Sequence, residues 1–166
     1  MQSQDHDLTT KIQALESMEA VRTLKFRYLN ACDDKQPERV RDCFAPGRID
    51  INFGHIGQFD SREAFVEVFV ELGCHEHIVD MHHAENMIVD LTGADSASAR
   101  VGLRFHSINT RDRTSVQLGG YYLDDYVRRD GQWLITASQF LVRSALIKDF
   151  SGEFEKVVWA GNHMPT

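Results

Sequence analysis

Asp33 is the residue whose position points most directly to chemistry. It follows a run of apolar residues at helical spacing, so it stands at the carboxyl end of an expected helix. Burial and the negative end of a helix dipole both raise the pKa of a carboxylate, and a carboxylate with a raised pKa can serve as a general base near neutral pH. The alternative is that Asp33 only ends the helix and is solvated beside Asp34. Both interpretations stay open from the sequence.

Histidines in two expected strands are candidates for proton transfer. His82 and His83 are adjacent, and side chains on a strand alternate between its faces, so at most one of them faces a pocket. A histidine in a pocket can move protons because imidazole titrates near neutral pH. His106 on the next strand can face the same cavity, which would provide one proton acceptor and one donor. For each histidine the alternative is a surface or subunit-interface position.

Tyr28 is a further catalytic candidate, which would hydrogen-bond the developing enolate or protonate a leaving hydroxyl, and three other residues are candidates for binding a substrate. Tyr28 precedes Asp33 by five residues, which turn a regular helix by about 500°, so the two side chains diverge by about 140°. They share a pocket only if the helix loosens near Asp33, and otherwise Tyr28 is a core tyrosine with a satisfied hydroxyl. Phe53, Tyr122 and Arg143 are the expected substrate-binding residues, although Arg143 can equally be exposed.

Metal and nucleotide cofactors are not expected. The segment 74–83 contains cysteine, histidine and aspartate side chains that invite a metal interpretation. Zinc ligands need tetrahedral spacing, however, and adjacent strand residues cannot converge on one ion. The sequence has no phosphate-binding glycine-rich loop and no dinucleotide fingerprint. We therefore expect no metal and no cofactor.

The elements that must position these residues are helices first and strands second. The pattern predicts helices over 8–32, 37–44 and 61–72 and strands over 48–53, 78–90, 96–108, 114–129 and 132–147. This order predicts an α+β fold, a cone-shaped barrel with N-terminal helices packed on a curved antiparallel sheet. We expect a disordered N-terminus over 1–7, one domain over 8–148, and a C-terminal tail over 149–166 that packs on the cone or on a neighbouring subunit.

Composition narrows the classes of partner. The chain has 166 residues with a formal net charge of −7 and no clustered basic patch, which argues against binding of nucleic acid. It has no run of about 18 apolar residues, so we expect no membrane span. The opening MQSQDHDLTT is unlike a secretory signal, and three cysteines without paired spacing are typical of reduced thiols. We therefore expect a cytoplasmic protein.

Four segments carry a family resemblance: LKFRYLNACDDKQPERVRDCFAP, RIDI, HHAEN and GGYYLDDYVRRDGQWLI. Over about residues 8–146 the chain resembles the SnoaL-like branch of the nuclear transport factor 2-like superfamily. That superfamily includes scytalone dehydratase, bile acid 7α-dehydratase, ketosteroid isomerase, limonene epoxide hydrolase and polyketide cyclases, together with pure binding proteins, so fold alone does not settle function.

The resemblance to scytalone dehydratase implies roles for particular residues. By that resemblance Asp33 is the active-site aspartate, His82 lies on the catalytic histidine strand, and His106 stands where a second histidine would be. The resemblance to bile acid 7α-dehydratase instead pairs Tyr28 with Asp33. A tyrosine that precedes the aspartate in scytalone dehydratase is replaced by Cys32 here, which predicts a substrate other than scytalone.

The resemblance implies a cofactor-independent lyase (a dehydratase) or an isomerase that uses Asp/His acid–base catalysis. The expected substrate is small, cyclic and hydrophobic, such as a steroid, a terpenoid or a polyketide. The alternative is a non-catalytic assembly or ligand-binding protein of the same fold, such as an oxygenase small subunit. An open pocket favours the enzyme, and an interior filled with side chains favours assembly. Because one sheet face is expected to be exposed, we also expect a homodimer or a homotrimer.

Overall fold

The computed structural model describes residues 2–165, and the side chains of residues 7–165. Helices dominate the first half of the chain and long strands the second. In chain order the elements are α1 (Gln2–Asp33), α2 (Pro37–Asp42), β1 (Arg48–Asn52), the short 3-10 helix η1 (Gly54–Ile56), β2 (Gln58–Ser61), α3 (Arg62–Gly73), β3 (Ile78–Gly93), β4 (Ser96–Asn109), β5 (Thr114–Arg129), β6 (Gln132–Asp149) and β7 (Lys156–Gly161). Among these described helices, none is long and apolar enough to cross a membrane.

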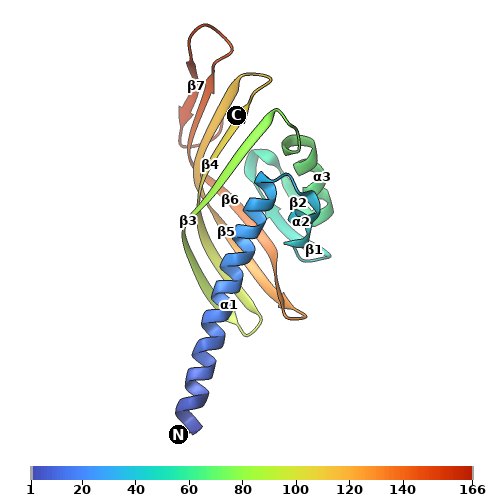
Figure 1. Ribbon diagram of the computed structural model, residues 1–166, viewed down its shortest axis with the longest axis vertical. Coiled ribbons are helices and arrows are strands. Elements are labelled where there is room, and N and C mark those ends of the chain that lie inside the picture. The colour runs from blue at the N-terminus through green and yellow to red at the C-terminus, as the bar shows by residue number, and fades with distance from the viewer. Residues whose placement is uncertain (1, 166) are drawn as a thin grey trace.

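Helix α1 lies along the sheet, and its N-terminal part projects beyond the strands (Figure 1). One stripe of buried side chains recurs every three or four residues along α1 and includes Ser17, Val21, Leu24, Tyr28 and Cys32. Toward the N-terminus the apolar side chains are exposed, with Leu15 at 63%. The helix begins at Gln2, within the segment 1–7 expected to be disordered, and Met1 lies outside the described residues.

The curved sheet has the strand order β2-β1-β6-β5-β4-β3, with β7 paired to β6. Strand β1 runs parallel to β6, and the other neighbours are antiparallel. The expected α+β class and curved sheet are confirmed, but the sheet is mixed rather than wholly antiparallel. The reason is that β1 pairs with a strand far along the chain, so the hairpin turns of the meander do not set its direction. In the described part of the chain β2 and β3 end the main strand order, β7 adds an edge strand beside the last part of β6, and the sheet stays open.

The four long strands of the second half are those expected from the alternating pattern: β5 has the expected bounds, and β3, β4 and β6 run one to three residues further. An Asp130–Gly131 turn joins β5 to β6, and both residues have positive φ, at 51° and 78°. This is the conformation of a tight hairpin turn that matches the twist of its strands. Pairing between β3 and β4 places His82 opposite Phe105. Because paired residues share a face, this register decides which side chains face the helices.

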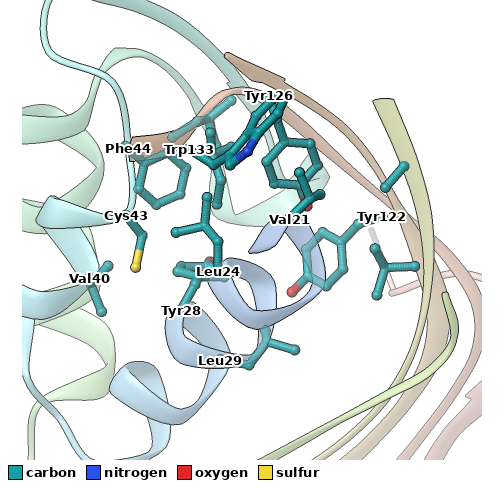
Figure 2. Close-up of a cluster of buried hydrophobic side chains, with 14 of the residues drawn as sticks. Val21, Leu24, Tyr28, Leu29, Val40, Cys43, Phe44, Tyr122, Tyr126 and Trp133 are labelled. Carbon is teal, nitrogen blue, oxygen red and sulfur yellow. The ribbon is translucent and has the colours of Figure 1, made fainter. Parts of the chain in front are cut away.

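An aromatic cluster fills the space between the helices and the sheet. Phe65 of α3 contacts the rings of Phe44 and Phe53, with centroids 5.3 and 5.4 Å away in edge-on geometry. Phe53 in turn lies 5.8 Å from Tyr122 of β5. Figure 2 shows Tyr28 of α1 between Phe44 on the helical side and Tyr122 on the sheet side. Edge-on aromatic pairs add to the stabilisation gained from burial, so the cluster forms a rigid inner wall.

Candidate active site

A cavity of about 310 Å³ opens between α3, the end of α1 and the strands β3 to β6. Its wall is mostly aromatic and aliphatic, and the rings that line it include Tyr28, Phe53, Phe65, Phe105, Tyr122 and Phe140. A few polar side chains also reach the cavity, namely His55, Asp80, His82 and Ser107. A largely apolar pocket with a few convergent polar groups is typical of a site for a small molecule.

Asp33 and His82 form the central pair of this site. Oδ1 of Asp33 lies 2.5 Å from Nδ1 of His82, and Oδ2 accepts a hydrogen bond of 2.9 Å from the backbone N–H of His82. A carboxylate can only accept, so Nδ1 carries a proton, and in the neutral ring Nε2 is the nitrogen with the lone pair. The His82 ring packs on Phe105 at 4.5 Å between centroids, on the cavity wall. The pair therefore presents an oriented base to an apolar pocket.

The other two candidate histidines lie on the opposite face of the sheet. His83 is exposed and pairs with Arg104, and His106 pairs with Met81. Since His82 faces the cavity, its neighbour His83 must face away from it. His106 follows the cavity-lining Phe105 and therefore also faces away. The expectation that His106 shares the cavity is thus corrected by the strand register.

Tyr28 reaches the cavity without contacting Asp33. Helix α1 continues to Asp33, so the expected divergence of the two side chains holds. Tyr28 instead shares a helix face with Cys32, four residues later, and both residues line the cavity. Burial raises the pKa of the Tyr28 hydroxyl well above its ordinary value. Tyr28 is therefore a neutral hydrogen-bond donor on the wall.

The three expected substrate-binding residues have different positions. Phe53 and Tyr122 are buried and line the cavity. Arg143 is exposed on β6 and is not among the residues of the cavity wall. A register shift between Gly120 and Gly119, opposite Val142 and Ser144, lies at that point of β6. Arg143 therefore cannot contact a molecule bound beside His82 in this conformation.

Sequence reasoning did not select His55, Asp80 or Ser107 as site residues, although each of them lines the cavity. His55 belongs to the 3-10 helix η1, which had no recognisable pattern, and burial lowers its pKa. Asp80 precedes His82 by two residues, so strand alternation places both on one face. The sequence alone therefore indicates that Asp80 and His82 share a face, but it does not indicate where η1 lies.

A buried ion pair lies behind the cavity wall. Nζ of Lys25 is 2.9 Å from Oδ2 of Asp124 and 3.4 Å from the ring centroid of Tyr122. Asp124 also accepts hydrogen bonds from Ser138 at 2.6 Å and from the Tyr126 hydroxyl at 2.8 Å. Burial lowers the pKa of Lys25, and attraction to Asp124 opposes that effect. The pair fixes the position of the Tyr122 ring.

The possible metal-ligating side chains of segment 74–83 do not converge on one site. Within residues 2–165, no three His, Cys, Asp or Glu side chains are arranged to hold a metal ion. His75 and His77 stack on each other with centroids 5.1 Å apart, and the His75 ring nitrogen Nε2 is 2.7 Å from the Glu71 carbonyl oxygen. His82 is engaged by Asp33. These contacts account for the histidines individually.

Solved structures with the same fold span nearly the whole chain at low identity. A scytalone dehydratase-like protein from Novosphingobium aromaticivorans is 21% identical, with a TM-score of 0.75 over 92% of this chain and 95% of that chain. The hexachlorocyclohexane dehydrochlorinase LinA-type3 from Novosphingobium barchaimii is 15% identical, with a TM-score of 0.72 over 94% and 99%. A candidate aromatic ring hydroxylase from Novosphingobium aromaticivorans is 20% identical, with a TM-score of 0.69 over 87% and 94%. At these identities the likeness shows a nuclear transport factor 2-like fold.

The sequence itself identifies the family. No curated protein matches the chain. The model of the SnoaL-like domain, in contrast, matches residues 13–139, which include both Asp33 and His82 and most of the cavity wall. The chain therefore belongs to the SnoaL-like domain family.

Proposed function

We propose that this protein is a cofactor-independent lyase or isomerase that removes a proton from carbon in a small, cyclic, hydrophobic substrate. The observation that carries the proposal is the pairing of Asp33 with His82 on the wall of an apolar cavity. Two structural relatives are described as a scytalone dehydratase-like protein and a hexachlorocyclohexane dehydrochlorinase, and both names denote eliminations. An elimination or an isomerisation of this kind begins with loss of a proton to a base.

The reaction follows from the orientation of the base. Nε2 of His82 takes a proton from the carbon next to a carbonyl group, and the electron pair of the broken C–H bond moves onto the carbonyl oxygen. In a dehydration the electrons return, a C=C bond forms, and the β-hydroxyl group takes the proton held by the His82 imidazolium and leaves as water. In an isomerisation the proton is returned to a different carbon. Asp33 orients the ring and stabilises the imidazolium that forms.

Tyrosine hydroxyls on the wall supply hydrogen bonds to the developing negative charge. Burial raises the pKa of both Tyr28 and Tyr122 well above the ordinary value, so both stay protonated at neutral pH. Donors held in a dry pocket are worth about 3 kcal/mol each at an oxyanion. Tyr28 takes this donor role rather than His106, because His106 lies on the other sheet face.

The alternative of an assembly protein predicts an interior filled with side chains. The cavity of about 310 Å³ supports a small-molecule site over such a filled core. A ligand-binding protein without turnover would have the same cavity, and a measurement of proton abstraction separates the two.

Proton abstraction can be measured without knowledge of the leaving group. Cyclic ketones, for example α-tetralone and cyclohexenone, are incubated with the protein in D₂O, and NMR follows the loss of the α-proton signal. We expect exchange above the buffer rate, and we expect Asp33→Asn and His82→Gln each to lower the protein-dependent rate at least ~100-fold.

Two histidines provide matched controls for this experiment. His83 lies on β3 beside His82, and His106 lies on the neighbouring strand β4, but both side chains are on the sheet face away from the cavity. His83→Gln and His106→Gln should therefore keep the wild-type rate. Exchange that survives in His82→Gln, or that is lost equally in all four variants, contradicts the proposal. Absence of any protein-dependent exchange favours the ligand-binding protein.

A further inference from the structure

Asp80 brings a carboxylate into the cavity that the proposed chemistry does not use. It lies on β3 two residues before His82 and lines the same wall. Among the residues that the structure describes, Oδ1 of Asp80 is buried and has no hydrogen-bond partner. Burying a polar atom without a partner costs free energy, and most buried polar atoms in native proteins are paired. The fold therefore holds an acceptor whose donor the described chain does not supply.

The basic side chains of Lys35 and His82 contact this end of the fold through partners other than Asp80. Lys35 donates through Nζ to the carbonyl oxygens of Ile78, at 2.6 Å, and of His75. The Nδ1 of His82 is committed to Asp33. These contacts fix the end of α1 to the start of β3, and they leave the Asp80 carboxylate facing the cavity without a positive partner.

Ser107 completes a polar patch beside Asp80. The two residues are directly opposite each other in the β3–β4 ladder, so their side chains lie on the same face. Both line the cavity, while the neighbouring wall is apolar, formed by Ile78, Val116 and Leu118. A carboxylate only accepts hydrogen bonds, whereas a serine hydroxyl can donate one. Rotation about χ2 is soft for aspartate, so either carboxylate oxygen can turn toward the cavity.

We propose that Asp80 and Ser107 form a second polar subsite that binds a hydroxyl group of the substrate. A hydroxyl donates to the Asp80 carboxylate and accepts from Ser107, so it satisfies both partners at once, whereas an ammonium can only donate. The inference rests on the proposed function, since it places the reacting carbon of the same molecule at His82.

The spacing along β3 defines the substrate class further. Two residues of a strand span about 7 Å, which separates the Asp80 subsite from His82. The hydroxyl group and the carbon that loses its proton therefore lie on opposite sides of a ring, not on neighbouring atoms. The preferred substrate is a hydroxylated cyclic compound with an otherwise apolar body.

Binding of two matched probes tests the subsite. Isothermal titration calorimetry compares β-naphthol, which carries a donor hydroxyl, with β-naphthyl methyl ether, which does not. We expect the wild type to bind the naphthol at least about tenfold more tightly, the scale of a hydrogen bond to a charged group. Asp80→Ala should bring the two affinities within about threefold of each other, and Asp80→Asn should give an intermediate preference.

Asp90→Asn is the matched control, because Asp90 is an exposed aspartate on the same strand, and it should keep the full preference. Equal affinity of the wild type for both probes, binding of neither probe, or a preference that survives in Asp80→Ala overturns the subsite. A preference that depends on Asp80 without any ketone exchange supports the subsite and contradicts the proposed proton abstraction. Ketone exchange that depends on His82, without a preference for the hydroxyl probe, supports the proposed proton abstraction and contradicts the subsite.

Discussion

The carboxylate of Asp33 holds His82 at two points, through Nδ1 of the ring at 2.5 Å and through the backbone N–H at 2.9 Å. The last residue of α1 is thereby fixed to the third strand of the chain, and one carboxylate sets both the strand position and the ring orientation. Both oxygens are occupied, so Asp33 orients the base and does not itself face a ligand. Because Asp33 orients the ring and His82 is the base, His82 lines the cavity while Asp33 lies behind it.

Asp33→Asn should disturb both contacts, because an asparagine side chain has one acceptor oxygen for two N–H donors. We expect a loss of about 1–3 kcal/mol in the free energy of unfolding, the cost of one partly buried donor left unpaired. We also expect the His82 ring to populate both neutral tautomers. Urea unfolding measures the first effect, and long-range ¹H–¹⁵N NMR of the imidazole measures the second.

Asp34→Asn is the control for this prediction, since Asp34 is the exposed neighbour of Asp33. It should leave stability and tautomer unchanged. A His82 ring that stays wholly in the Nδ1–H form in Asp33→Asn would show that Asp33 does not select the tautomer.

The buried pair of Lys25 and Asp124 should respond differently to single and double replacement. Both side chains are fully buried at 0% exposure, so removal of one charge leaves the other without a counter-ion. We expect Lys25→Met to lower the free energy of unfolding by about 3–5 kcal/mol. The double variant Lys25→Met/Asp124→Asn should recover part of that loss, because it removes the unpaired charge. Urea unfolding of the variants checks this, and a double variant with fully additive losses contradicts the coupling.

Much of the site could be predicted from the sequence, and the misses have a physical cause. A helical pattern that ends at Asp33 and an alternating strand that holds His82 are local features, and local periodicity reveals them. His106 was assigned to the cavity because the sequence does not give the register between β3 and β4. A shift of one residue moves every side chain of a strand to the other face, and here Phe105 rather than His106 pairs with His82.

Long-range pairing was the other feature that the sequence could not supply. The parallel pairing of β1 with β6 depends on a contact between distant segments, and alternation within 48–53 carries no information about direction. Strand alternation places Asp80 on the same face as His82, but the lack of a hydrogen-bond partner for its Oδ1 depends on the groups that surround it in three dimensions. Periodicity predicts elements and faces, whereas partners across the fold require the structure.

Tyr122 should make the stability of the protein sensitive to alkaline pH. Burial raises the pKa of its hydroxyl well above the ordinary value near 10, and the negative charges of neighbouring groups add to the effect. Below about pH 10 the tyrosine is protonated in both the folded and the unfolded state. Above that pH the unfolded chain releases the proton while the folded chain keeps it, so stability falls as pH rises. The slope for one such group is about 1.4 kcal/mol per pH unit.

Tyr122→Phe should remove this contribution while it keeps the aromatic ring above Lys25, whose Nζ lies 3.4 Å from the centroid. Tyr28 and Tyr126 remain and continue to contribute, because burial also raises their pKa values. Urea unfolding over about pH 8 to 11 should therefore give parallel curves for the two proteins below pH 10 and a shallower decline for Tyr122→Phe above it. Equal slopes in the alkaline range would mean that the Tyr122 hydroxyl ionises in the folded protein as it does in water, which contradicts its buried position in the apolar wall of the site.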